Sequence, residues 1–225
     1  LIANGVHLIG RSFKYHRPRG ILSAGVEESG ALVTVGIGEY RDPNVRATTQ
    51  ELYEGLNASG QNAFPNVNFD LGYINNYLGR FFSAGFYYKT FMGIPPFEWG
   101  KGTGTWMIFE KLIRKAAGMG SASKLPDPDH YEHANGYCDV VIIGSGPSGI
   151  AAALEAAEKK LDVILIEQDS LIGGDQLTEE DIFNQNEIKK TLESSGIKIM
   201  TRTTAFGLYD NCVLGLIERV KDHYF

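Results

Sequence analysis

The stretch "CDVVIIGSGPSGIAAALEAAEKKLDVILIEQDSLIGGDQL" at residues 138–177 decides the fold of the second half of the chain. A short apolar run ends at Gly144, an alanine-rich segment follows, and a second apolar run ends at Glu167. Gly144, Gly146 and Gly149 fit the G-x-G-x-x-G pattern of a strand–turn–helix that binds a dinucleotide. The stretch therefore predicts a βαβ unit with a dinucleotide site at its glycine-rich turn.

Each glycine has its own expected role in this site. Gly144 allows the sharp turn, Gly146 lets the backbone approach a pyrophosphate, and Gly149 lets the helix pack closely on the strand. Free amides at the start of the helix are expected to meet the phosphates. Glu167 is expected to bind the adenosine ribose, and its carboxylate favours NAD or FAD over NADP because it repels a 2′-phosphate. The predicted cofactor-binding residues include a second glycine loop: Gly144, Ser145, Gly146, Pro147, Ser148, Gly149, Glu167, Gln168, Gly173 and Gly174.

The composition, with 43% hydrophobic and 21% charged residues in a chain of 225, is typical of one or two globular domains. We expect an α/β protein with a β-rich, ferredoxin-like domain and an irregular connecting region at residues 1–120, and a linker at 121–136. Residues 137–225 are expected to form the first part of a doubly wound, Rossmann-type domain. Within the first domain, a turn at Asp42-Pro43 and the spacing of Leu52 and Leu56 predict a helix.

One loop of the first domain has the spacing of a metal-cluster loop without its ligands. Ser23, Glu28 and Ala31 stand at the x4 and x2 separations that plant-type ferredoxins fill with cysteines. The chain has two cysteines, Cys138 and Cys212, and neither lies in this loop. We therefore expect a scaffold loop with no iron–sulfur cluster, and we predict no metal site elsewhere.

Charge and hydropathy limit the possible partners. A formal charge of −6 argues against nucleic-acid binding. No apolar run is long enough to cross a membrane and no signal peptide is visible, so we expect a cytoplasmic protein. Residues 1–26 nevertheless contain Arg11, Lys14, Arg17 and Arg19 without any acid. This basic loop is a candidate contact for an acidic partner surface or for the phosphates of the dinucleotide.

Five blocks in fixed order give the chain a family resemblance. They are "GRSFKYHRPRGILSAGVEE", "PNVRATTQELYEGL", "FYYKTFM", "DPDHYEH" and "DVVIIGSGPSG", and together they span most of the chain. In these blocks the chain resembles the front part of the α subunit of heterotetrameric sarcosine oxidase. Relatives of that family with cysteines at the positions of Ser23, Glu28 and Ala31 bind a [2Fe–2S] cluster, whereas the sarcosine oxidase α subunits keep the loop without ligands.

The resemblance implies a function for the assembled enzyme. It implies oxidative demethylation of sarcosine to glycine, with transfer of the one-carbon unit to tetrahydrofolate and formation of hydrogen peroxide. It also implies NAD in this chain, FAD and FMN in the complex, and β, γ and δ subunits as partners. No catalytic residue is expected in this segment, which we expect to be part of a longer polypeptide and inactive alone.

Two alternatives stay open at this stage. The glycine-rich site holds FAD if the chain belongs to a related flavin amine or opine dehydrogenase. The segment is a non-catalytic assembly module if its nucleotide site has decayed and its basic loop docks a partner. One residue departs from the extended fingerprint, because Lys160 stands where a glycine is common at the turn into the second strand.

Overall fold

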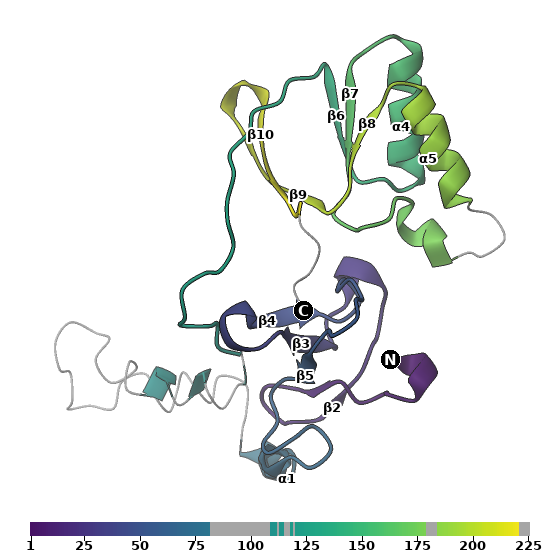
Figure 1. The fold of residues 1–225 in the computed structure, drawn as a ribbon. Coiled ribbons are helices and arrows are strands. Elements are labelled where there is room, and N and C mark those ends of the chain that lie inside the picture. Colours follow the sequence, from purple (N-terminus) through teal and green to yellow (C-terminus); the bar gives the residue numbers. More distant parts are fainter. Residues whose placement is uncertain (82–108, 112, 115–117, 119, 179–183, 221–225) are drawn as a thin grey trace. The chain divides into compact units, whose positions relative to one another are not determined.

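A computed structural model describes residues 1–81, 109–111, 113–114, 118, 120–178 and 184–220 (Figure 1). The chain divides into two compact units, Leu1–Asp129 and His130–Phe225, and each is described by itself. The division falls within the segment 121–136, where the sequence predicts a linker. Much of the predicted irregular connecting region, residues 82–108, lies outside the described residues.

The first unit is built around a small antiparallel sheet of order β4-β3-β5. Its central strand is buried, and Val33 and Val35 of this strand form a core with Ile9 and Ala31. A second, two-stranded sheet pairs β1 with β2. The strands are β1 (Gly10–Arg11), β2 (Pro18–Arg19), β3 (Leu32–Val35), β4 (Asp42–Arg46) and β5 (Ala58–Gly60). The helical segments are η1 (Ile2–Asn4), η2 (Gly25–Glu27), η3 (Gly38–Tyr40), η4 (Leu71–Tyr73), α1 (Ile74–Tyr77) and η5 (Leu78–Arg80).

The helix predicted after Asp42-Pro43 is wrong. Pro43 lies in the edge strand β4, where a residue without an amide hydrogen is tolerated, and residues 47–57 contain no helix. The two leucines that suggested a helical face do not share an environment. Leu52 is 82% exposed, whereas Leu56 packs against the core of the first unit. The start of the segment pairs with β3, and the spacing of two leucines beyond it was too weak a signal for a helix.

The second unit contains the predicted βαβ arrangement. Its sheet has the order β6-β7-β8, and all pairs are parallel. The central strand β7 is an almost continuously buried apolar run, as expected for a strand covered on both sides by neighbours. The strands are β6 (Val140–Ile143), β7 (Val163–Ile166), β8 (Lys198–Met200), β9 (Thr203–Tyr209) and β10 (Val213–Glu218). The helical segments are α4 (Pro147–Glu158), η6 (Gly174–Thr178), α5 (Gln185–Ser194) and η7 (Asp210–Cys212).

Helices α4 and α5 lie on the same face of this sheet (Figure 1). Both pack on a core that contains Ile150, Ala153, Leu165 and Leu192. Among the described residues no helix covers the other face, where Ile143 is 62% exposed. The described part therefore has the strand order and helix packing of half a dinucleotide-binding domain, and the second helical layer of a doubly wound fold stays a prediction.

Three local features bear on the sequence predictions. The antiparallel strands β9 and β10 form a hairpin, and Asn211 at its turn has a positive φ of 60°. Lys160 has a φ of 60°, so a residue with a side chain occupies the left-handed conformation that favours glycine. Among the described residues, no helix is both long and apolar enough to span a bilayer.

Candidate functional site

The glycine-rich turn between β6 and α4 has a geometry that only glycine supports at two positions. Gly144 has a φ of 93°, outside the region that other residues adopt readily. A Cβ added at Gly149 would lie 1.9 Å from the carbonyl oxygen of Gly144, so helix α4 approaches the end of β6 too closely for a side chain. A Cβ at Gly146 would meet no atom of a described residue within 4 Å. The space in front of Gly146 is therefore open.

Helix α4 begins directly behind this turn with unsatisfied amides. Pro147 occupies the first turn, and no side chain caps the helix at Gly146. The amides of Ser148 and Gly149 belong to the first turn, which has no acceptor within the helix. A helix of 12 residues also places positive partial charge at this end. Open space and free amides together form a site for an anion such as a pyrophosphate.

Glu167 lies at the end of β7, and its buried carboxylate contacts the glycine-rich turn. Oε2 accepts hydrogen bonds from the amide of Ser145 at 2.8 Å and from its hydroxyl at 2.5 Å. Oε1 accepts a hydrogen bond from the amide of Asp169 at 3.0 Å. A carboxylate offers about four lone-pair positions, and three are used here. Among the described residues, no donor occupies the remaining acceptor position on Oε1.

The second glycine loop lies against the first. The Ser145 hydroxyl accepts a hydrogen bond from the amide of Gly173 at 3.1 Å. A Cβ added at Gly174 would lie 3.3 Å from Cα of Gly146, and both Gly173 and Gly174 have positive φ angles of 126° and 57°. The predicted glycines and Glu167 thus gather around one turn.

One predicted residue is not part of this cluster, and one role was missed. Gln168 is exposed and makes no hydrogen bond with another described residue. The glycine-rich pattern indicates no role for the side chain of Ser145, yet its fully buried hydroxyl joins Glu167 to the Gly173 loop. The signal was available in the sequence, because a hydroxyl residue stands between two glycines of the fingerprint. Asp169 was missed altogether because it contributes its backbone amide.

The loop at residues 22–31 in the first unit is organised by Glu28. Its carboxylate accepts hydrogen bonds from the amides of Leu22 at 2.7 Å, Ser23 at 3.0 Å and Ala31 at 2.9 Å, and from the amide of Gly30. The Ser23 amide contributes most, and together the four amides lower the pKa of Glu28 from 4.5 to about 2 although burial opposes the shift. The ionised carboxylate is thus an internal anchor of this loop.

Both halves of the chain match known families. Residues 1–63 match the model of the 2Fe-2S iron-sulfur cluster binding domain. Residues 139–203 match the model of the FAD dependent oxidoreductases. The second match contains the glycine-rich turn, Glu167 and the Gly173–Gly174 loop.

Relatives match over nearly the whole chain. The sarcosine oxidase subunit alpha of Rhizobium meliloti (strain 1021) is 48% identical over 231 residues, which cover 99% of this chain. The chain is a homologue of sarcosine oxidase α subunits. The corresponding subunit of Corynebacterium sp. (strain U-96) is 28% identical over 97% of this chain. The chain spans only 23% and 18% of the lengths of these two relatives.

A solved structure, that of L-proline dehydrogenase from P. horikoshii, covers 97% of this chain and 32% of its own chain at 20% identity. The TM-score is 0.46, and a similarity of this size adds nothing to the assignment of the fold.

The match of residues 1–63 corrects the expectation that this chain has no iron–sulfur cofactor. The matching family binds a 2Fe-2S cluster, so the family indicates such a cofactor. The expectation rested on the lack of thiolates in one loop, and the match of residues 1–63 to a cluster-binding family contradicts it. Cys138 and Cys212 both lie outside the matched segment, and the Glu28 carboxylate already accepts four amides. The residues of this loop therefore do not fit a cysteine-ligated cluster.

The match of residues 139–203 corrects the assignment of cofactors to chains. The family resemblance implied NAD in this chain and FAD in its partners, whereas the residues of the site left NAD and FAD open. The matching family is FAD-dependent, and its model covers the glycine-rich site of this chain. The earlier assignment failed because NAD and FAD share the adenosine diphosphate half that the fingerprint recognises.

Proposed function

We propose that this chain is the dinucleotide-binding part of a sarcosine oxidase α subunit and that its glycine-rich site takes the adenosine diphosphate half of FAD. The observation that carries the proposal is the arrangement around Gly146. Open space, free helix amides and the Glu167 carboxylate lie together at the carboxyl end of a parallel sheet, where ligands of this fold class bind. The FAD-dependent family of residues 139–203 supports FAD as the occupant.

Each group of the site has a distinct task in this proposal. The amides of Ser148 and Gly149 donate to the pyrophosphate, whose negative charge the start of α4 stabilises. The free acceptor position on Oε1 of Glu167 receives a ribose hydroxyl. The same carboxylate excludes a ribose that carries a 2′-phosphate, because the two anions repel each other. FAD supplies the redox chemistry when it is bound, and these residues bind and orient its adenosine half.

For the assembled enzyme, we propose the oxidation of sarcosine, the reaction after which its relatives are named. The substrate is demethylated to glycine, the one-carbon unit passes to tetrahydrofolate, and oxygen becomes hydrogen peroxide. The β, γ and δ subunits are the proposed partners, and the present segment is proposed to have no oxidase activity by itself. The relatives support this proposal because they are named as α subunits of sarcosine oxidase.

The test is a titration of the full chain with FAD, NAD and NADP, monitored by calorimetry and by flavin fluorescence. We expect FAD to bind most tightly and NADP not to bind. Gly146→Val should abolish FAD binding without disturbing the fold, because its side chain enters the open space that the pyrophosphate needs. Gly136→Val is the matched control, since a Cβ at Gly136 also meets no atom within 4 Å but lies outside the turn. Unchanged FAD affinity in Gly146→Val would refute the proposed site.

A further inference from the structure

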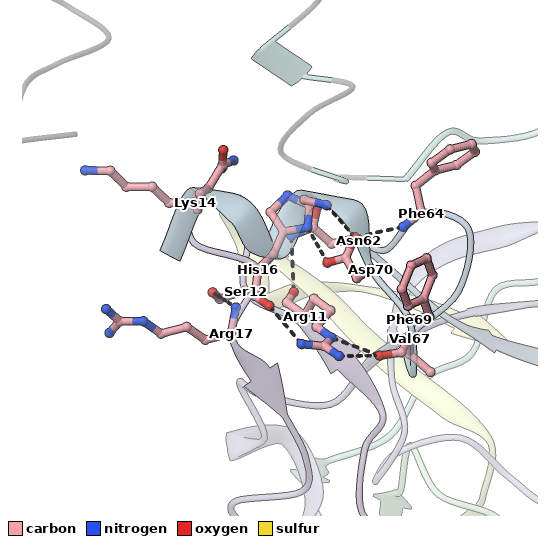
Figure 2. A network of polar contacts seen from close by, with 12 residues as sticks. Arg11, Ser12, Lys14, His16, Arg17, Asn62, Phe64, Val67, Phe69 and Asp70 are labelled. Atoms are coloured by element: carbon pink, nitrogen blue, oxygen red, sulfur yellow. Dashed lines mark hydrogen bonds and ion pairs between the residues drawn. The ribbon is translucent and has the colours of Figure 1, made fainter. Parts of the chain in front are cut away.

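The basic loop of the first unit separates its cations into two groups. Arg11 points inward, where Nε and Nη2 donate to the carbonyl oxygen of Val67 at 2.9 and 2.7 Å, and Nη1 donates to that of His16 at 3.2 Å. Lys14 and Arg17 point away from this network (Figure 2). Arg11 is thus part of the framework, whereas Arg17 is exposed and Lys14 is half-buried.

Buried polar contacts fix the loop that carries these cations. His16 is buried and shares a hydrogen bond of 2.6 Å between Nδ1 and Oδ2 of Asp70. Asp70 in turn accepts hydrogen bonds from the amides of Phe64 and Gly72, each at 3.0 Å. A Cβ added at Gly72 would lie 2.3 Å from the His16 ring, so the ring is packed directly on this backbone. The loop is therefore held in one conformation before any partner arrives.

Two cations converge on one aromatic ring in this loop. Nζ of Lys14 lies 5.0 Å from the centre of the Tyr15 ring, and Cζ of Arg17 lies 4.8 Å from it. The ring itself rests on the chain at Gly79, where an added Cβ would lie 3.4 Å from Cε1 of Tyr15. The positive charges of Lys14 and Arg17 repel each other at this ring. An anion bound near both would reduce this repulsion, so the site favours an anion.

Hydrogen bonds hold the Arg17 side chain in an orientation that suits binding of an anion. Its Nε donates to Oδ1 of Asn76 at 2.7 Å, and its amide donates to Oγ of Ser12 at 3.0 Å. Among the described residues, the terminal amino groups of Arg17 have no hydrogen-bond acceptor, and the residue is exposed. These two groups form a planar fork that matches the two oxygens of a carboxylate. A fork already fixed by Asn76 and Tyr15 loses little entropy on binding.

Large apolar side chains lie beside this fork along the chain. Phe13 is 64% exposed, and Tyr77, which follows Asn76, is 75% exposed. Arginine and aromatic residues are enriched where protein partners bind most strongly. A nucleic acid is disfavoured as the partner because the chain as a whole carries a formal charge of −6. The composition favours a protein surface over a nucleic acid.

We propose that residues 13–17 together with Asn76 and Tyr77, here named the Tyr15 surface, dock an acidic surface of another subunit. A carboxylate of the partner binds the fork of Arg17 and lies near Lys14, while Phe13 and Tyr77 contact apolar groups around it. Residues 1–26 contain four Lys and Arg residues and no acid in a chain of charge −6, so this surface is electrostatically distinct and complements an acidic partner. This inference rests on the proposed function as a subunit of a larger enzyme.

The test uses the full-length α subunit produced together with the other subunits of the enzyme. In Lys14→Glu/Arg17→Glu, the affinity measured by titration of tagged α subunit with the remaining subunits should fall at least about tenfold, since the variant repels an acidic surface. Lys189→Glu/Lys190→Glu is the matched control, because it makes the same charge change on exposed residues of α5. Arg17→Lys keeps the charge but loses the fork, and should give an intermediate loss.

Native mass spectrometry and circular dichroism complete the test. The expected result is a folded Lys14→Glu/Arg17→Glu variant that has lost the other subunits and kept its flavin. Normal assembly of this variant would overturn the inference, whether or not the flavin is lost. The inference would also be overturned if the variant lost only contacts between two copies of this chain and kept the other subunits. If the wild-type chain bound none of the other subunits, both the proposed function and the inference would be contradicted. If the wild type assembled and the variant assembled equally well, the inference alone would be contradicted.

Discussion

Glu28 and Glu167 are two buried carboxylates with opposite relations to the space around them. The carboxylate of Glu28 accepts hydrogen bonds from four amides at most six residues away in the chain, and these amides fill its four acceptor positions. Glu167 contacts Ser145, which is 22 residues away, and keeps one acceptor position. The first carboxylate closes a loop on itself. The second joins a strand end to the glycine-rich turn and retains capacity for a ligand.

The difference shows that a buried acid is not by itself a sign of a functional site. Glu28 is 2% exposed and Glu167 is 6% exposed, so burial does not distinguish them. Their acceptor positions do, because a carboxylate with every lone pair occupied has nothing left to offer a ligand. Glu28 is therefore expected to affect stability alone, and Glu167 is expected to affect nucleotide affinity.

The largest expected effect is that of Glu28→Gln on the stability of the first unit. The amide side chain has a single acceptor oxygen, so at least two backbone amides of the loop lose their partner. Each unsatisfied buried donor costs roughly 1–3 kcal/mol, and we expect a loss of about 3 kcal/mol. Urea unfolding followed by circular dichroism measures this loss. An unchanged unfolding midpoint, or reduced FAD affinity at full stability, would reverse the distinction between the two glutamates.

The next effect is that of Glu167→Gln on FAD binding. The substitution removes the charge that strengthens a hydrogen bond to the ribose, which is worth roughly 1.5–3 kcal/mol and corresponds to about a tenfold to hundredfold loss of affinity. NADP should gain relative to NAD, because the repulsion of a 2′-phosphate disappears. Calorimetric titrations of the wild type and the variant at equal ionic strength provide the comparison. Equal FAD affinities would mean that Glu167 is an internal anchor like Glu28.

Low pH should reduce the stability of the first unit through Glu28, which lies in that unit. Its pKa is lowered in the folded protein from 4.5 to about 2, so the unfolded chain takes up a proton that the folded chain does not. The stability contributed by this group is therefore complete above about pH 4.5 and is lost as pH falls toward 2, by about 1 kcal/mol per pH unit. Hydrogen exchange of residues 22–31 across this range measures the loss. Glu28→Gln should abolish this pH dependence, and its persistence in the variant would assign the effect to other carboxylates.

The smallest expected effect is that of Ser145→Ala. Without the hydroxyl, Glu167 loses one of its three hydrogen bonds and the Gly173 amide loses its acceptor. The lost hydrogen bond to the Glu167 carboxylate is charge-assisted, but it affects FAD only by way of Glu167, so FAD affinity should fall about threefold to tenfold, less than in Glu167→Gln. The double variant Ser145→Ala/Glu167→Gln should then bind FAD as weakly as Glu167→Gln alone. Strictly additive losses in this cycle would show that the two residues act independently.

The glycine-rich unit was predictable because several signals agreed on it. The apolar runs, Gly144, Gly149 and the acid at Glu167 all required the same βαβ arrangement, and the structure has it. The first unit offered no such agreement. Its order comes from contacts distant in sequence, such as Arg11 with Val67 and His16 with Asp70, which no local pattern reveals. The start of the segment predicted as a helix likewise pairs with β3 as strand β4.

The choice of cofactor was beyond the reach of the sequence pattern for a related reason. The fingerprint reports the adenosine diphosphate half of a dinucleotide, and this half is common to NAD and FAD. The role of Ser145 depended on the side-chain rotamers of two loops that meet only in the folded chain. Contacts of this kind follow from tertiary packing and are not encoded in residue spacing.

Hydrogen exchange with and without FAD tests the central claim most directly, because it compares the two carboxylate-centred regions in one experiment. The amides of Ser148 and Gly149 should exchange rapidly in the free chain and become protected when FAD binds. The amides of Leu22, Ser23, Gly30 and Ala31 should be equally protected in both states, since Glu28 already accepts their hydrogen bonds. Protection that appears at residues 22–31 and not at the glycine-rich turn would contradict the assignment of the FAD site.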